Sequence, residues 1–235
     1  TIEIDELERE RSVILQEIHQ ANDNPEDVIF DNFQETAYPE QAMGMQILGD
    51  AKVVRSLRRE LIIDYMNDHY NSNTMILSAA GRVDHDELVN LAHKSFSDLT
   101  RGEKTPKDPA LYAGGQSYKT RKLEQAHVIL GFEGVSYEDP DFHATAVLST
   151  ILGGGMSSRL FQEIREKRGL VYSIYSFVPS YSDSGLLGIY AGTSEEETQK
   201  LIPLVCDEIK KICDSVDADE LIRAQNQIKA SVLMA

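Results

Sequence analysis

Residues 101–115 constrain the fold most, because they divide the chain into two halves that each combine strands with long helices. This segment is rich in Gly, Pro, Lys and Thr and has no apolar periodicity, which is typical of a linker. The sequence therefore predicts an α+β protein of two domains. The first would occupy residues 1–100 and the second residues 116–235, with the linker at 101–115 between them.

Apolar periodicity and turn residues predict the elements of each half. Before the linker we expect helices from Asp5 onward and over 25–38, 53–70 and 86–99, and a buried strand over 73–81. After the linker we expect strands over 117–123, 126–132, 171–181 and 185–192, and helices after Pro140 and over 157–169, 195–214 and 217–235.

The charge of the chain disfavours one class of partner. The formal net charge is −16, so nucleic-acid binding, which needs a basic face, is not expected. Residues 1–40 hold twelve Asp or Glu against two Arg. Such a surface attracts basic partners, although solubility alone also accounts for it. No apolar run approaches the roughly 18 residues of a membrane span.

Cys206 and Cys213 are the only cysteines, and they lie seven residues apart in a predicted helix. Their sulfurs would be about 10 Å apart along the helix axis, too far for a disulfide. We expect both thiols to be reduced and mostly buried. A reducing compartment, such as the bacterial cytoplasm or alternatively the mitochondrial matrix, fits this expectation.

Two carboxylates interrupt the apolar stripe of the first predicted helix. Glu10 and Glu17 are seven residues apart and share the face that carries Leu7 and Ile14. A buried carboxylate without a partner costs several kcal/mol or becomes neutral. The pair therefore meets buried Arg or Lys, binds a cation, or lies on a solvated face, and periodicity alone leaves these alternatives open.

The histidines do not complete a metal site. None of the six forms H-E-x-x-H or H-x-x-E-H, and His85 and His93, eight residues apart, have the wrong spacing to share an ion. Zinc needs about three protein ligands. No complete metal site can be assigned from this sequence.

The stretch GGGMSSRLFQEIREKRGLVYSIYS, residues 153–176, is the strongest motif of the second half. Its Gly triplet is neither a P-loop nor a dinucleotide fingerprint. Arg165 lies on the predicted helix and Tyr172 on the following strand. The two side chains can converge and offer a guanidinium and a phenol to a carbonyl oxygen. A surface Arg beside a half-buried strand Tyr is the alternative.

This stretch, together with ELERERSVILQEI, FDNFQETAYPEQAMGMQILG and AHVILGFEG, resembles the pitrilysin/insulinase-type zinc peptidases and specifically their processing-peptidase branch. The resemblance covers nearly the whole chain in the right order. It implies two homologous α+β domains, each a mostly antiparallel sheet covered by helices, both incomplete here.

The resemblance also implies roles for particular residues. Glu17 matches the downstream Glu that completes the zinc site. Glu10 matches an acidic residue that orients the zinc ligands without itself binding the ion. Arg165 and Tyr172 match a pair that acts on the substrate. The remaining zinc ligands, two His, would belong to an H-x-x-E-H segment, whose Glu would move the proton of the attacking water.

That segment is absent from this sequence, so we expect an internal piece of a longer zinc metalloendopeptidase, inactive alone. Its parent would clamp extended, basic, presequence-like peptides or unfolded protein between two domains, and would form a homodimer or a heterodimer with a related subunit. The alternative is a non-catalytic scaffold or partner subunit of the same family, in which the zinc motif is truly lost.

Overall fold

The computed structural model describes residues 2–102 and 108–234, so part of the predicted linker, residues 103–107, lies outside the described residues. The chain forms two compact units. One contains residues 1–18 and 48–108, and the other contains residues 19–47 and 109–235. These units are defined by contacts within this chain, and the domain boundary at 101–115 stays a prediction.

Among the described residues, helices are the only regular secondary structure of the first unit. They are α1 (Ile4–Asp23, whose last turn belongs to the second unit), α3 (Ala51–Ser56), α4 (Arg59–His69) and α5 (His85–Phe96). Arg11 of α1 donates to the carbonyl oxygens of Val54 and Leu57 and so satisfies the C-terminal end of α3. Arg59 donates to the carbonyl oxygen of Ile2 at 2.6 Å. These two arginines fix α1 to α3 and α4.

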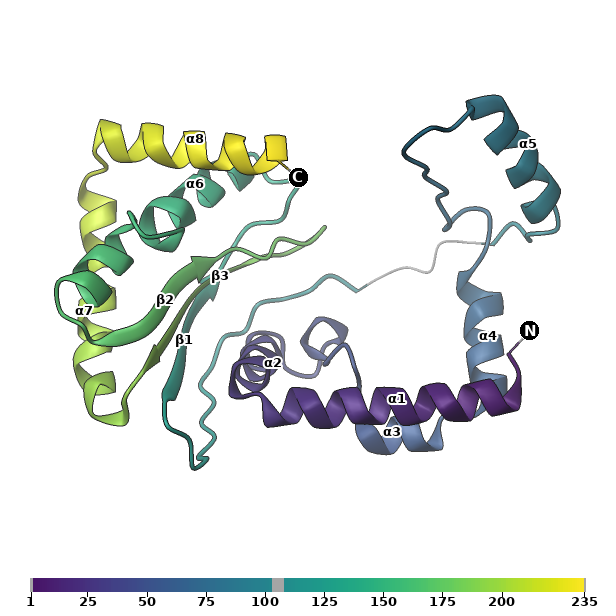
Figure 1. Cartoon of the computed structure of the whole chain (residues 1–235), viewed down its shortest axis with the longest axis horizontal. Helices are drawn as coiled ribbons and strands as arrows, with labels where there is room; N and C mark the ends of the chain where they lie inside the picture. The colour runs from purple at the N-terminus through teal and green to yellow at the C-terminus, as the bar shows by residue number, and fades with distance from the viewer. Residues whose placement is uncertain (1, 103–107, 235) are drawn as a thin grey trace. The chain divides into compact units, whose positions relative to one another are not determined.

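The second unit is built around a sheet of three antiparallel strands in the order β1-β3-β2 (Figure 1). Its elements are α2 (Pro25–Ala37), the 3₁₀ turn η1 (Ala42–Gly44), β1 (Ala126–Glu133), α6 (Phe142–Gly153), the π-helix η2 (Phe161–Glu166), β2 (Val171–Phe177), β3 (Leu186–Thr193), α7 (Glu195–Asp214) and α8 (Ala218–Met234). The predicted α+β class with an antiparallel sheet is confirmed.

The two faces of the sheet are covered by different helices. Helices α6, α7 and α8 lie on one side and α2 lies on the other (Figure 1). Ile189 and Ala191 of β3 pack into the core on the first side, with Ile151 of α6 and Leu201 and Val205 of α7. On the second side, Phe30 of α2 stacks on Tyr190 of β3 with ring centroids 5.8 Å apart. Alternate residues of the central strand therefore serve two separate cores.

Opposed glycines make room for the aromatic rings on the α2 side. Gly131 of β1 faces Gly188 of β3 in the register of the sheet. A Cβ at Gly131 would lie 2.0 Å from the ring of Phe33, and one at Gly188 would lie 2.1 Å from the ring of Phe177. The two rings meet edge to face at 5.9 Å. The glycine pair thus forms the depression that accepts these rings.

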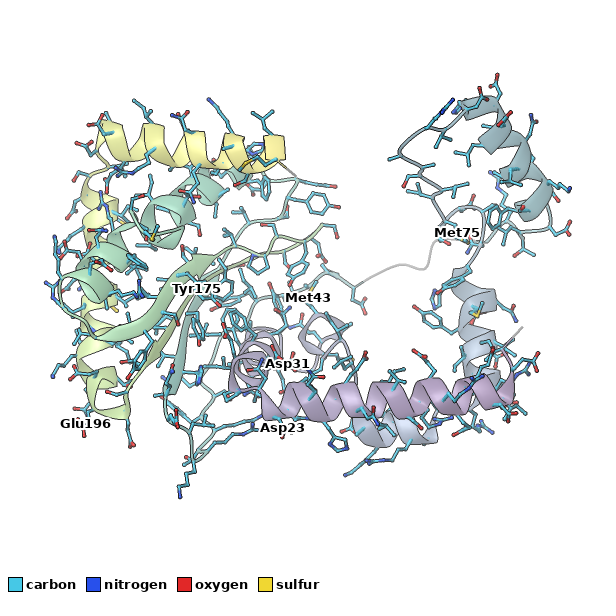
Figure 2. The ribbon with its side chains drawn as sticks, viewed as in Figure 1. Asp23, Asp31, Met43, Met75, Tyr175 and Glu196 are labelled. Carbon is cyan, nitrogen blue, oxygen red and sulfur yellow. The ribbon has the colours of Figure 1, made fainter. Side chains whose placement is uncertain are left out.

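Side-chain hydrogen bonds also tie α2 to the sheet. Tyr175 of β2 donates to Glu26 of α2 at 3.0 Å, and burial, followed by Glu26, raises the pKa of the Tyr175 phenol. Figure 2 labels Tyr175 on the sheet and Asp31 on α2. His127 of β1 lies within hydrogen-bond distance of the Tyr190 hydroxyl, at 2.9 Å.

Several local predictions were wrong. Residues 73–81 and 117–123 form no strand, because neither segment pairs with another. The predicted helix over 53–70 is interrupted at Leu57 and Arg58, which have extended backbone. Cys213 is exposed rather than buried, and both cysteines are free thiols. Among the described residues, no helix is long and apolar enough to cross a membrane.

Replacing Gly188 by Ala is expected to destabilise the fold by about 1–3 kcal/mol, since the new methyl group overpacks the Phe177 ring. The free energy of unfolding, measured in urea, checks this. Gly192→Ala is the matched control on the same strand and face, because its Cβ would meet side-chain ends alone, those of Gln125 and Ser173 at 3.1 Å and the Tyr190 hydroxyl at 3.5 Å. Equal stability of the two variants would contradict the proposed role of the glycine pair.

Candidate functional site

Tyr172 lies at an irregularity in β2. Val171 pairs with Thr193 and Ser173 with Gly192, so Tyr172 is an extra residue without a partner in the register. Such a bulge redirects a side chain and increases the local twist. Tyr172 is 65% exposed, and its hydroxyl makes no hydrogen bond with any described residue. The bulge therefore presents a phenol to solvent beside the sheet.

Arg165 of η2 is held next to this bulge. Its Nε donates to the carbonyl oxygen of Tyr172 at 3.0 Å, and its guanidinium lies 4.6 Å from the centre of the Phe161 ring. Glu166 is 3.7 Å from Nη1. The terminal nitrogens make no hydrogen bond with any described side chain or backbone group. The structure brings Arg165 and Tyr172 together, with polar ends available to a ligand.

The sequence analysis missed Phe161, although its spacing of four residues before Arg165 is the helical spacing that places two side chains side by side. Its ring fixes the direction of the guanidinium. The sequence predicted an ordinary helix here, whereas residues 161–166 form a π-helix. Single π-turns of this kind are frequent at functional sites.

The other basic residues of this motif are already occupied. Lys167 and Arg168 both pair with Glu163, and these two cations lower the pKa of the Glu163 carboxyl. Gly169 then ends the turn with φ +65°, a conformation that favours glycine. Of the three basic side chains at 165, 167 and 168, only that of Arg165 contacts the Tyr172 bulge.

The Gly triplet before η2 has a packing role. A Cβ at Gly153 would lie 2.4 Å from the backbone nitrogen of Ser176, so glycine lets α6 approach β2 closely. Ser149 and Ser176 join the same two elements by a hydroxyl contact of 2.9 Å. Gln227 of α8 donates to the carbonyl oxygen of Gly154 at 2.6 Å. These contacts explain the triplet without an anion.

A bidentate ion pair fixes the end of this loop to α8. Arg159 donates to both carboxylate oxygens of Glu220, at 2.9 and 2.7 Å, and to the carbonyl oxygen of Ser215 at 2.8 Å. Both side chains are largely buried, and the Arg159 guanidinium lowers the pKa of Glu220. The motif that carries Arg165 is thus anchored at its start.

Glu10 and Glu17 lie on an exposed face of α1. Neither forms an ion pair or hydrogen bond with another described residue, so the alternative of a buried ion pair is wrong. Glu10 lines a groove of about 650 Å³ within the first unit, together with Leu7, Ile14 and Leu57. The apolar stripe containing the two carboxylates is therefore accessible rather than packed.

The position of Glu17 is compatible with one ligand of a metal ion, but not with a complete site. An exposed, unpaired carboxylate such as Glu17 suits one zinc ligand, but zinc takes about three from protein. Within residues 2–102 and 108–234, no three His, Cys, Asp or Glu side chains come close enough to hold a metal ion.

The chain matches known proteins along its length. Residues 56–228 match the family described as "Peptidase M16 inactive domain". A Rickettsia felis protein named as an uncharacterized zinc protease is 44% identical over 98% of this chain and 56% of its own length. The human mitochondrial-processing peptidase subunit beta is 34% identical over 97% of this chain and 49% of its own length.

The fold matches as well. A crystal structure of a peptidase M16 inactive domain from Pseudomonas fluorescens superposes with a TM-score of 0.82 at 23% identity, over 99% of this chain and 57% of that one. Fold and sequence together define a peptidase-type α+β protein. The chain belongs to the peptidase M16 family, which confirms the predicted resemblance. It spans about half the length of the curated relatives it matches.

The Arg159–Glu220 ion pair allows a prediction about how the stability of the fold depends on pH. Because the folded-state pKa of Glu220 lies below its ordinary 4.5, the pair stabilises the fold above about pH 4.5, and this stability is lost as the pH falls through the folded-state pKa. Glu220→Gln should lower the free energy of unfolding at pH 7 by about 1–3 kcal/mol and reduce its dependence on acid pH. Urea unfolding at pH 7 and pH 3.5 measures both effects.

Glu138→Gln is the control, because Glu138 is exposed and its carboxylate makes no hydrogen bond or ion pair with a described residue. If both variants followed the same pH profile as the unmodified chain, the ion pair would have no role in anchoring the loop.

Proposed function

We propose that this chain is part of a zinc-dependent metalloendopeptidase that cleaves extended, basic, presequence-like peptides, and that it is inactive without the rest of that enzyme. The observation that carries the proposal is the juxtaposition of Arg165 and Tyr172, two exposed side chains with hydrogen-bond donors, on a motif anchored at its start. Family membership and the names of the relatives support it.

Glu17 would hold the zinc ion as one ligand, and two His outside this chain would supply the others. When bound, zinc would polarise the scissile carbonyl and lower the pKa of a bound water. Glu10, two turns earlier on the same face of α1, would orient the zinc ligands without itself binding the ion. The link between Glu17 and the Arg165–Tyr172 pair rests on the family resemblance alone.

Arg165 and Tyr172 would act on the peptide carbonyl. The carbonyl oxygen of Tyr172 already orients the guanidinium through Nε, so the terminal nitrogens need little reorganisation to donate to a substrate oxygen. The phenol would donate to the same oxygen as its negative charge develops. Within the described residues the phenol has no competing hydrogen bond, and the guanidinium would compete only with its 3.7 Å ion pair to Glu166.

The acidic N-terminal region would favour basic peptides. Twelve Asp or Glu fall in residues 1–40, and Figure 2 labels Asp23 and Asp31 among them. Burial, followed by the neighbouring Asp27, raises the pKa of Asp31, as expected where acidic groups gather on one helix. A surface of this charge raises the local concentration of Arg-rich and Lys-rich segments.

A non-catalytic partner or scaffold subunit is the second candidate. The description of the matched family as an inactive domain favours it. The two candidates differ in the intact gene. An in-frame H-x-x-E-H upstream of Glu17 supports the peptidase, whereas a related upstream domain with those residues replaced supports a subunit of a homodimer or heterodimer.

Bacterial and mitochondrial relatives both occur, so we propose the bacterial cytoplasm or, alternatively, the mitochondrial matrix as the compartment.

Glu17→Gln in the intact gene product should abolish tight zinc binding, because an amide is a much poorer zinc ligand than a carboxylate. Metal analysis after dialysis measures this, with Glu3→Gln as the control at an exposed acid beside the start of α1. Full zinc content in the Glu17 variant would reject its role as a ligand. The isolated chain should retain no stoichiometric zinc.

Tyr172→Phe should lower kcat of the intact gene product by the equivalent of about 2–4 kcal/mol, if the phenol stabilises the developing oxyanion. Zinc content and the free energy of unfolding should stay unchanged. The matched control is Tyr137→Phe, since Tyr137 is 53% exposed and its hydroxyl has no partner among the described residues. Unchanged turnover of the Tyr172 variant on an Arg-containing peptide would remove it from the mechanism.

A further inference from the structure

The three cations at the end of η2 are paired to different degrees. Lys167 and Arg168 both contact the carboxylate of Glu163, Arg168 at a distance of 2.9 Å. Arg165 has a looser contact, since the Glu166 carboxylate lies 3.7 Å from its Nη1, beyond the length of a hydrogen bond. One carboxylate therefore engages two cations of this turn and leaves the third, Arg165, at the Tyr172 bulge.

The π-turn explains how one carboxylate meets two successive cations. In an α-helix, side chains three and four residues apart are neighbours. Here the backbone nitrogen of Lys167 donates at 3.0 Å to the carbonyl oxygen of Gln162, five residues earlier, so the turn is wider by one residue. Lys167 follows Glu163 by four residues and Arg168 follows it by five. The Arg168 guanidinium also donates to the carbonyl oxygen of Glu163, at 2.5 Å.

Glu163 is more shielded than its partners and stays charged. Its side chain is 24% exposed, whereas those of Lys167 and Arg168 are 61% and 40% exposed. The hydrogen bond from Lys167, followed by that from Arg168, lowers the pKa of the Glu163 carboxyl, so it is ionised at neutral pH. Ion pairs with such exposed cations add little to the stability of a fold. Their main effect is to cancel part of the positive field at this surface.

That field extends to the candidate site. Lys167 and Arg168 lie within three residues of Arg165, and the backbone nitrogen of Gly169 donates to the carbonyl oxygen of Arg165 at 3.0 Å, which keeps the turn compact. Exposed charges act over roughly 8 Å at physiological ionic strength. An extended peptide advances only about 3.3 Å per residue, so the side chains flanking a carbonyl held by Arg165 would lie within this range. Cations without a counter-charge would repel a basic side chain there.

We propose that Glu163 is a specificity-determining residue, which neutralises Lys167 and Arg168 and so lets the site accept a peptide with a basic side chain beside the carbonyl held by Arg165. We draw this conclusion on the basis of the proposed function, and it names the residue that makes the Arg165–Tyr172 pair compatible with a basic substrate. Glu163 does not touch the peptide. It acts through the two cations that it holds.

Glu163→Gln in the intact gene product tests the proposal with two peptides. The first carries Arg on both sides of the cleaved bond, and the second carries citrulline, the neutral analogue of Arg, at the same positions. At about 10 mM salt, KM for the Arg peptide should rise about three- to tenfold while kcat stays unchanged, because one opposing charge is lost. KM for the citrulline peptide should not change. At about 1 M salt the effect should disappear.

Two further variants separate charge from structure. Lys167→Gln combined with Arg168→Gln frees the Glu163 carboxylate, so KM for the Arg peptide should fall below that of the unmodified protein, and adding Glu163→Gln should raise it again. Glu138→Gln is the matched control. It removes the same charge after the end of β1 that pairs with Leu186, whereas the bulge lies at the opposite end of β3, and it should leave both peptides unaffected.

The outcomes distinguish two kinds of failure. If the unmodified gene product cleaves neither peptide, the proposed function is wrong and the role of Glu163 is wrong with it. If it cleaves both, and Glu163→Gln changes KM for both peptides equally or for neither, the role of Glu163 alone is wrong. Where Glu163→Gln does not fold, the Lys167 and Arg168 double variant decides, because an unchanged KM for the Arg peptide would also contradict the proposal.

Discussion

The contact between the aromatic rings of α2 and the glycines of the sheet is the interaction on which the second unit depends. A small sheet must exclude water from both faces, and the chain covers the two faces with helices from distant parts of the sequence. Phe33 and Phe177 fit only because Gly131 and Gly188 oppose each other across β1 and β3. This contact fixes α2 against a sheet whose first strand begins nearly ninety residues after α2 ends.

The same contact fixes the register of the central strand. A shift of β3 by one residue would move Ile189 and Ala191 from the helical core to the aromatic face, and would place a side chain where Gly188 admits a ring. Because β2 pairs with β3, this register also sets where the bulge at Tyr172 falls. The position of the candidate site is therefore a consequence of packing on the opposite face.

Patterns within a single element predicted most of the second unit. The strands β1, β2 and β3 and the long helices α7 and α8 follow from alternation, helical spacing and capping residues, which are local properties. The segment 73–81 was predicted as a strand from equally good local evidence, but pairing is a property of two segments, and no described segment pairs with it. Residues 117–123 were also predicted as a strand, and they form none. Instead, the side chains of Lys119 and Arg121 tether that stretch to Asn32 and to the carbonyl oxygen of Asn22.

The site was predictable to a similar degree. Spacing placed Arg165 and Tyr172 near each other, and the structure brings them into contact. Periodicity could not give the bulge or the π-turn, because both depend on one extra residue accommodated against neighbours in space. For Glu10 and Glu17, the stripe predicted a shared face but not its exposure, since exposure depends on what packs against the helix.

The bulge at Tyr172 has a consequence for how such a protein changes over generations. The residue lies outside the paired register, its ring is largely in solvent, and its contact with Arg165 is made by a backbone oxygen that any amino acid supplies. Substitution there alters the chemistry offered to a ligand while leaving the sheet and the arginine in place. A lineage can thus gain, exchange or abandon reactivity at this position without passing through a misfolded ancestor, and descent of the architecture does not guarantee descent of the activity.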